Sequence, residues 1–259
     1  MTALPTSEAP GHHMTVWEHI AELRRRLLIC IVAVALGGVV AYIAWPLLID
    51  LITKPFCRQV EDCQLYATDP LAPFTIRLQV SLYGGVILAM PVLLWQLWRF
   101  VTPGLHKNER RYVIPFVVCA LLLFGMGATL AYFALGPALD FLFGVAGPDV
   151  AQIPTVDRYL TLTLYMMLAF GIGFEFPVLL VALQLVGILQ PRQLASARRY
   201  AAVIIVVVAA VITPSGDPIT LAVLALPMYL LYEASILIGW LVARRRSRNA
   251  AADVPDTIS

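Results

Sequence analysis

The chain has 259 residues, of which 60 % are hydrophobic and only 13 % are charged, and its mean hydropathy is +0.83. These values lie well outside the range of soluble globular proteins and predict a polytopic membrane protein. The formal net charge of +2 conceals an uneven distribution along the chain.

Charged residues divide the chain into six candidate membrane spans, because about 20 apolar residues cross a hydrocarbon core of ~30 Å. Residues 1–13 and 244–259 are polar and are expected to be disordered, so that residues 14–243 form one all-α transmembrane domain. The six spans cover residues 27–49, 78–98, 112–139, 159–187, 200–213 and 219–243.

The basic residues predict how the spans are oriented. An even number of spans places both termini on one side, and that side carries fourteen of the eighteen Lys and Arg residues. The positive-inside rule therefore predicts cytoplasmic termini. The basic clusters follow from this topology, so nucleic-acid binding is not needed to explain them. The four basic residues on the other side are Lys54, Arg58, Arg77 and Arg158.

The segment from Trp17 to Leu27 carries apolar residues at helical spacing and leads directly into the first span. This pattern predicts an amphipathic helix at the cytoplasmic surface. Glu22 lies one turn before Arg26, a favourable spacing for an ion pair. Two interpretations are open: a surface helix whose acid is paired internally, or a carboxylate that is offered to a cationic partner.

Two of the four cysteines, Cys57 and Cys63, share the first external loop and could form a disulfide if that compartment is oxidising. Cys30 and Cys119 lie inside spans and are expected to pack as apolar residues. Because no histidine is near the loop cysteines, no metal site is expected.

The loop after the second span holds another acid, Glu109, next to Lys107, Arg110 and Arg111. It allows the same two interpretations as Glu22: an incidental acid in a basic cluster that sets topology, or a ligand for a cation. A guanidinium is held best by carboxylate oxygens in bidentate geometry.

Glu175 is the only charged residue between Tyr159 and Gly187, and it lies near the middle of the fourth span. An acid at that depth costs roughly 2.5–3.5 kcal/mol on insertion scales and usually marks a function or an internal contact. Pro177 removes a backbone donor nearby and is expected to kink the helix. Glu175 is thus either a site residue or a carboxyl bonded to a neighbouring helix.

The last two spans are predicted to be short. Arg199 and Pro214 bracket residues 200–213, which as a helix would cover about 21 Å. The sixth span contains Pro227 and Glu233, which shorten its uninterrupted apolar part. We expect neither helix to cross a membrane of full thickness.

Taken together, the motifs resemble those of the TatC family, the C subunits of twin-arginine protein translocases, from Met14 to Ala243. Each motif alone is weak, but their order is specific. The matching segments are H-x-x-E-L-R-x-R-L at 19–27, F-x-x-P-x-L-x-x-x-E-R-R at 100–111, F-E-x-P at 174–177, T-P-S-G-D-P at 213–218 and A-L-P-M-Y at 225–229.

The resemblance implies a subunit that recognises signal peptides with consecutive arginines and helps to move folded proteins across a membrane, driven by the proton-motive force. It implies no catalytic residues, cofactor or metal. Expected partners are these signal peptides, single-span TatA- and TatB-type subunits, further copies of the chain, and membrane lipids. The expected location is a bacterial-type cytoplasmic (inner) membrane.

The resemblance also implies roles for individual residues. A cytoplasmic patch would bind the signal peptide, and it consists of Glu22, Glu109, Arg24, Lys107 and Phe100. Glu175 would face the concave side of a glove-shaped bundle of six helices and meet a polar group of a single-span partner. Pro55 and Asp217 match external positions that the family depends on, with a role in loop shape.

One position departs from the family pattern. A glutamine often follows the aspartate equivalent to Asp217 by four residues, and here that position is Leu221. A polar contact between helices in a membrane contributes on the order of 1 kcal/mol. Its loss puts in question whether a partner helix docks on the last two spans by a polar contact.

Two other functional classes are open on the residues alone. A proton-coupled transporter of small solutes also uses buried acids and broken helices, but six spans without a repeat and a short fifth span argue against it. An intramembrane protease would need a histidine near a nucleophile. All four histidines lie outside the spans on the cytoplasmic side, at His12, His13, His19 and His106.

Overall fold

The computed structural model describes residues 16–57, 66–67, 69–101, 113–146, 155–213 and 217–252, except the side chains of 16–19, 100–101, 113, 146 and 245–252. Within these ranges the chain is helical apart from turns and one isolated β-bridge between Tyr66 and Thr155. The helices are α1 (Val16–Ile43), α2 (Trp45–Cys57), α3 (Ala72–Val101), α4 (Val113–Ala146), α5 (Val156–Val186), α6 (Pro191–Ser196), α7 (Arg198–Ile212) and α8 (Pro218–Ala252).

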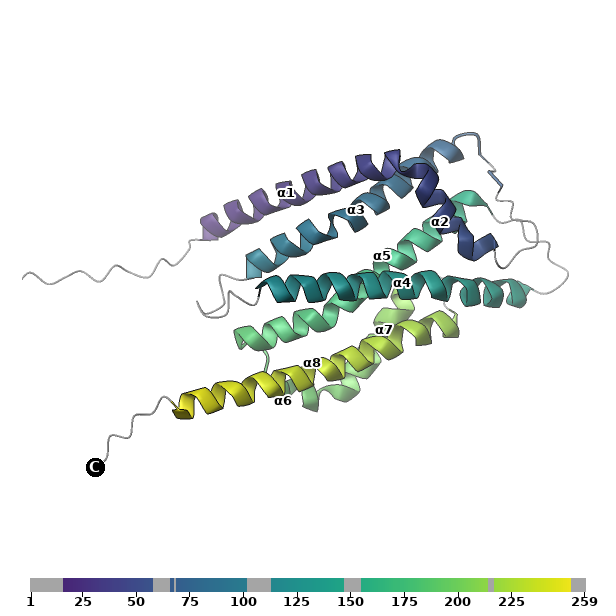
Figure 1. The fold of residues 1–259 in the computed structure, drawn as a ribbon. Coiled ribbons are helices and arrows are strands. Elements are labelled where there is room, and N and C mark those ends of the chain that lie inside the picture. Colours follow the sequence, from purple (N-terminus) through teal and green to yellow (C-terminus); the bar gives the residue numbers. More distant parts are fainter. Residues whose placement is uncertain are drawn as a thin grey trace, which may run out of the picture.

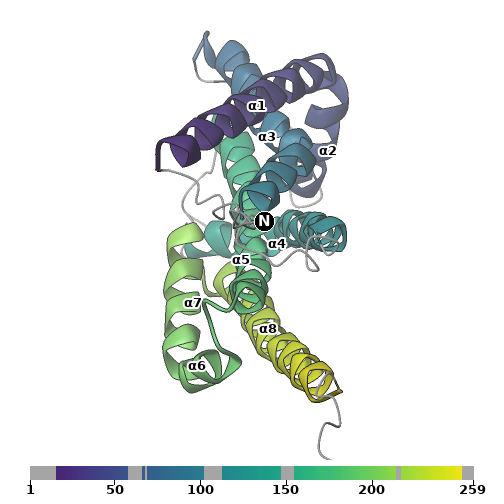
Figure 2. The same ribbon diagram turned by 90° about the vertical axis from the view of Figure 1, so that its left-hand side faces the viewer.

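The long helices run side by side, and α1 begins at the same end of the molecule at which α8 ends (Figure 1). Helices α4 and α5 occupy the middle, with α1 and α3 on one side and α7 and α8 on the other (Figure 2). The most extensive contacts join α1 to α3, α4 to α5, and α5 to α8. The central helix α5 therefore connects the two halves of the molecule.

Helix α1 packs closely against α3 where Gly37 and Gly38 of α1 meet Gly85 of α3. A Cβ added to Gly85 would lie 2.6 Å from the backbone nitrogen of Gly38, and one added to Gly37 would lie 2.7 Å from the carbonyl oxygen of Gly85. Small residues allow such close backbone approach between helices in a membrane. The rest of α1 faces largely outward, with hydrophobic side chains exposed along its length.

The first span ends earlier than predicted, at Ile43 rather than Ile49. Pro46 is the cause, because it has no N–H to donate to the carbonyl of Tyr42. The guanidinium of Arg77 takes that place: its Nη2 donates to the Tyr42 carbonyl at 3.4 Å, and its Cζ lies 4.0 Å from the centroid of the Tyr42 ring. The chain then continues from Trp45 as the separate helix α2.

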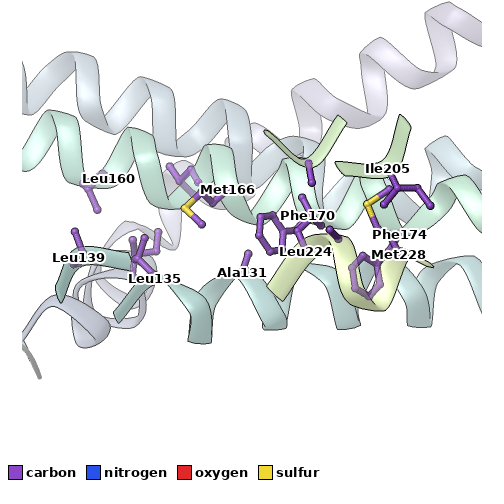
Figure 3. Close-up of a cluster of buried hydrophobic side chains, with 14 of the residues drawn as sticks. Ala131, Leu135, Leu139, Leu160, Met166, Phe170, Phe174, Ile205, Leu224 and Met228 are labelled. Carbon is purple, nitrogen blue, oxygen red and sulfur yellow. The ribbon is translucent and has the colours of Figure 1, made fainter. Parts of the chain in front are cut away.

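The core lies along α5, between α4 and the last helices (Figure 3). Leu160, Met166, Phe170 and Phe174 of α5 are almost completely buried. They pack in one cluster with side chains of α4, α7 and α8, namely Ala131, Leu135, Leu139, Ile205, Leu224 and Met228. The path of α5 is thus fixed by burial on several sides.

Five helices of the described chain are long and apolar enough to cross a membrane. Helix α7 has 15 residues and covers about 22 Å, so the prediction of a short fifth span is confirmed. The matching prediction for the sixth span is wrong. Helix α8 continues through Pro227, and its apolar part runs over 27 residues, Pro218–Arg244. Proline is tolerated in membrane helices whose neighbours compensate the lost bond.

The end of α8 also differs from the predicted domain boundary. The helix continues past Ala243 to Ala252, although the chain was expected to be disordered from Arg244 onward. Arginine and alanine favour helix, which explains the extension. Residues 1–13 and 253–259 lie outside the described chain. Of the cysteines, Cys57 is disulfide-bonded and Cys30 and Cys119 are free thiols, while Cys63 lies outside the described residues.

Candidate functional site

Exposed arginines gather where α1 begins and α8 ends, which we call the arginine-rich end. Among the described residues they are Arg24, Arg25, Arg99, Arg192, Arg198, Arg199 and Arg244. The opposite end carries several acids, including Asp50, Asp69, Asp140 and Asp157. The predicted charge asymmetry therefore corresponds to the two ends of the helices.

Glu22 lies on α1 at the arginine-rich end and forms an ion pair with Arg26, one turn further along the helix. Arg26 also reaches α3, where its Nη1 donates to the carbonyl of Gln96 at 3.2 Å. The side chains of Glu22 and Arg26 are 26 % and 12 % exposed. The pair is therefore internal as well as local, and it ties α1 to the last turns of α3.

The other residues of the predicted patch are only partly described. Arg24 is exposed on α1, close to Glu22 in sequence. The backbone of Phe100 belongs to the last turn of α3, next to Gln96, but its side chain is not among those described. Lys107 and Glu109 lie outside the described residues. The structure thus brings Glu22 to the end of α3, from which the loop containing Glu109 departs.

Glu175 borders an open cavity of about 390 Å³ between α3, α5, α7 and α8, and several of the residues that line it are exposed. Apart from Glu175, the lining consists of glycine and of aliphatic, aromatic or thioether side chains from α3, α5, α7 and α8, among them Trp98, Phe176 and Met228. Oε1 of Glu175 is buried and has no hydrogen-bond partner in the described chain. If Glu175 were a carboxyl bonded to a neighbouring helix, this oxygen would be expected to have such a partner, and it has none there.

The surroundings of Glu175 leave room beside the carboxylate. Helix α5 continues through Pro177, whose missing N–H leaves the carbonyl of Gly173 without its helical donor. A Cβ added to Gly173 would meet Met228 of α8 at 3.6 Å, an ordinary contact distance. The result is one polar group in an apolar cavity, an arrangement that can bind an apolar segment carrying a single hydrogen-bonding group.

Pro55 lies inside α2 and is buried. It cannot donate to the carbonyl of Leu51, and the hydroxyl of Tyr132 on α4 donates to that oxygen instead, at 3.0 Å. The hydroxyl of Tyr159 on α5 donates to the next carbonyl, that of Ile52, at 2.8 Å. Pro55 thus leaves the Leu51 carbonyl free to accept the hydrogen bond from Tyr132, and this bond holds α2 against α4. Sequence reasoning missed the two tyrosines, because no local pattern marks them.

Asp217 caps the N-terminus of α8 and is completely buried. Its Oδ2 accepts a hydrogen bond from the backbone N–H of Thr220 at 2.7 Å, and its Oδ1 accepts one from the Thr220 hydroxyl. Pro218 occupies the first helical position, where it is well tolerated. This geometry gives the expected role in loop shape a physical basis: the carboxylate fixes where α8 begins.

Leu221, the position that departs from the family pattern, is partly buried against the core. Its side chain offers no polar contact one turn after Asp217.

No local pattern in the sequence marks two further polar contacts, which hold α8 against its neighbours. Glu233 forms an ion pair with Arg198 of α7 at 2.9 Å and accepts a hydrogen bond from the Tyr229 hydroxyl at 3.2 Å. Gln184 of α5 donates to the carbonyl of Ser235 at 3.1 Å. The ion pair gives Glu233 a structural role, since it joins α8 to the start of the short helix α7.

Comparison with known proteins gives one consistent result. Residues 18–227 match the family model described as Sec-independent protein translocase protein (TatC). The chain is 41 % identical to the Sec-independent protein translocase protein TatC of Frankia casuarinae, over 97 % of this chain and 73 % of that protein. It is 39 % identical to the protein of the same description from Aquifex aeolicus, over 90 % of this chain and 98 % of that protein.

The fold is similar to that of a solved structure described as the twin-arginine translocase receptor TatC. The TM-score is 0.74 at 39 % sequence identity, and the match covers 87 % of this chain and all of the other. A second structure of the same receptor, in the detergent DDM, gives a TM-score of 0.75 over 86 % of this chain and 99 % of the other.

Proposed function

The chain belongs to the TatC family of Sec-independent protein translocases, and we propose that it is the subunit that recognises twin-arginine signal peptides. In this role it carries no reaction of its own. It binds the signal of a folded cargo protein and passes the cargo to a complex driven by the proton-motive force. The comparisons give no support to the alternative of a solute transporter.

The observation that carries the proposal is the position of Glu22. Its carboxylate lies at the arginine-rich end, on the first turns of α1 and beside the last turns of α3. Glu109 follows in the loop that leaves α3, so we assign the two carboxylates to the two guanidinium groups of the signal. Arginine rather than lysine suits such a site, because a planar guanidinium can bond both oxygens of a carboxylate.

The other residues of the patch complete the proposal. Arg24 and Lys107 would hold backbone carbonyls or acidic groups of the signal peptide, and Phe100 would supply apolar contact. This assignment places the arginine-rich end in the cytoplasm, as the positive-inside rule requires. In a bacterial-type inner membrane, both termini of the chain would then face the cytoplasm.

Glu175 supports a second contact, inside the membrane. Its cavity offers an apolar surface with one polar group whose Oε1 lacks a partner in the described chain. We assign it to a single-span subunit of the TatA or TatB type that carries a polar side chain at matching depth. Pairing that side chain with Glu175 would relieve the cost of an unsatisfied polar group in hydrocarbon.

Site-specific crosslinking tests the proposal. Membranes containing the chain are incubated with a photoreactive signal peptide carrying Arg-Arg or Lys-Lys, and the experiment is repeated with Glu22→Ala and Glu109→Ala. We expect capture of the Arg-Arg peptide only, and its loss in both variants. Capture of both peptides at the same level, unchanged by either substitution, would reject the recognition role. Glu233→Ala is the matched control, since it removes an acid at the same end that is paired within the bundle.

A further inference from the structure

The carboxylate proposed to bind a signal arginine already holds an arginine of its own chain. Arg26 contacts Oε1 of Glu22 through Nη2, and its other terminal nitrogen, Nη1, donates to the carbonyl of Gln96. The second carboxylate oxygen, Oε2, is buried and has no partner in the described part of the chain. In the unliganded protein, therefore, one oxygen of Glu22 is engaged and the other is shielded from solvent.

A signal arginine cannot reach both oxygens of this carboxylate as it stands, because Arg26 contacts Oε1 and Oε2 is buried. Bidentate binding of a guanidinium uses both oxygens, and it requires Arg26 to move so that Oε2 becomes accessible and Oε1 is shared no longer. A guest must therefore displace Arg26 from Glu22 before it can bind fully. We propose that Arg26 is a built-in competitor for Glu22, which lowers the affinity of every cationic guest by one common factor. The proposal rests on the function proposed above.

The structure provides a place for the displaced arginine. Gln96 lies on α3, and its carbonyl can keep the Arg26 guanidinium when Glu22 releases it. With a side chain only 12 % exposed, Arg26 is held against α3 and does not have to enter solvent. The exchange therefore replaces the Arg26 guanidinium on Glu22 by that of the signal. Glu22 keeps a cationic partner, and Arg26 keeps its hydrogen bond to the Gln96 carbonyl. This feature distinguishes Arg26 from Arg24 and Arg25, which are exposed on the same helix.

A competitor of this kind affects specificity by lowering the apparent affinity of all guests, so that only those with a high intrinsic affinity still bind. The apparent affinity of any guest falls by the fraction of sites that are open, whichever guest arrives. A strong guest, such as an arginine pair, still binds at working concentrations. A lysine pair binds as point charges without the bidentate contact, and the same factor keeps it below a useful affinity. The ratio of the two affinities is set by Glu22, and their absolute level by Arg26.

The test compares two substitutions that remove the same charge. Dissociation constants for soluble Arg-Arg and Lys-Lys signal peptides are measured on the purified full-length chain with Arg26→Gln and Arg25→Gln. Only the first substitution removes the contact to Glu22. We expect Arg26→Gln to tighten binding of both peptides by the same factor, roughly three- to tenfold beyond the Arg25→Gln control, which is the range of one partly buried charged contact.

Other outcomes overturn the proposal. Weaker binding of the Arg-Arg peptide in Arg26→Gln would make Arg26 a residue that orients Glu22 for the guest. A gain no larger than that of Arg25→Gln would reduce it to a nonspecific positive charge. Arg26→Lys guards against a folding defect: it keeps the charge and should give a smaller gain, while an unchanged melting temperature in both variants shows that α1 remains docked.

Different results would reject the proposed recognition function itself. If the wild-type chain shows no preference for Arg-Arg, or if Glu22→Gln leaves that preference intact, the recognition role itself is wrong. If the preference exists and depends on Glu22 but Arg26→Gln does not strengthen binding, only the competitor is rejected.

Discussion

Glu22 and Glu175 are both acids in an apolar chain, and each has one buried oxygen without a partner among the described residues, but only Glu22 also forms an ion pair there. Glu22 lies at the arginine-rich end and is paired with Arg26, which α3 also holds. Glu175 lies in the middle of α5 beside an apolar cavity, and its Oε1 has no partner in the described chain. At Glu22 the guanidinium of Arg26 occupies the place proposed for a signal arginine, whereas no side chain of the described chain pairs with Oε1 of Glu175.

The difference suggests how each site selects its guest. A guest of Glu22 must compete with an internal guanidinium, so binding there is an exchange that favours strong cationic ligands. A guest of Glu175 needs only to arrive with an apolar surface and one polar group, since an unsatisfied polar group in hydrocarbon is already unfavourable. The first site is suited to selecting a signal, and the second to holding a membrane partner.

The largest expected effect comes from replacing Glu175 by leucine. Export should fall at least tenfold, because a partner's polar group would lose its bond and stay buried. The folded chain itself should become no less stable, since an unpartnered acid leaves an apolar site. Export of a twin-arginine reporter from intact cells and thermal unfolding of the purified chain measure the two effects.

Glu175→Gln is the control for that experiment. Glutamine can still exchange a hydrogen bond with the partner, so most of the export should return. A clear loss of stability in Glu175→Leu would show that the acid supports the fold, and the contrast with Glu22 would then fail.

A smaller effect is expected where α1 meets α3, which positions Glu22. Gly85→Ala would place a Cβ 2.6 Å from the backbone of Gly38, and backbone atoms cannot move aside cheaply. Such overpacking costs about 1–3 kcal/mol in unfolding free energy. We expect a lower melting temperature and weaker binding of the signal peptide, with little change in partner association at Glu175.

Gly125→Ala provides the comparison for Gly85→Ala, because a Cβ at that point of α4 would meet nothing within 4 Å. Alanine favours helix over glycine, so this variant should be neutral or slightly more stable. Equal behaviour of the two variants would contradict the close contact between α1 and α3.

The contact between α5 and α8 should be less sensitive. A Cβ added to Gly239 would lie 1.7 Å from Oε1 of Gln184, which is the end of a flexible side chain. Gln184 can swing away, at the loss of its hydrogen bond to Ser235, so Gly239→Ala should cost about 1 kcal/mol. Thermal unfolding measures this. Gln184→Leu combined with Gly239→Ala should show less than additive loss, and full additivity would mean that the two positions are independent.

The smallest expected effect is a difference in salt dependence between binding at Glu22 and association at Glu175. Raising the salt concentration from 0.05 to 0.5 M should weaken binding of the signal peptide at Glu22 by a few-fold, because the screening length for charges near solvent falls with salt, from about 10 Å at 0.1 M to about 3 Å at 1 M. Association at Glu175 should not change, since it lies away from the aqueous phase. Titrations of the peptide and of the partner at both salt concentrations make the comparison, and equal salt dependence would contradict it.

The sequence was sufficient for much of the fold. Apolar runs between charges predict the spans, and the short interval between Arg199 and Pro214 predicts the short helix α7. Two of the errors involve prolines. Pro46 ends the first span because Arg77 takes over the Tyr42 carbonyl, while Pro227 does not shorten α8. Both outcomes depend on partners more than 30 residues away or on neighbouring helices, which a local pattern does not contain.

The candidate site was predictable to the same extent. The spacing of Glu22 and Arg26 predicts an ion pair on one helix, and the structure has it. The contact from Arg26 to the carbonyl of Gln96 is 70 residues distant in sequence, and no pattern indicates it. The depth of Glu175 was visible from the length of the fourth span, but the cavity beside it arises only where four helices meet.

The most direct test of the central claim is a double-mutant cycle between Glu22 and the arginine pair of the signal. The affinities of the wild-type chain and of Glu22→Gln are measured for peptides carrying Arg-Arg and Lys-Lys, in one buffer. If Glu22 binds the guanidinium, the two changes should be coupled by at least about 1.4 kcal/mol, a factor of ten. Additive effects, within about 0.5 kcal/mol, would mean that Glu22 does not contact the arginine pair.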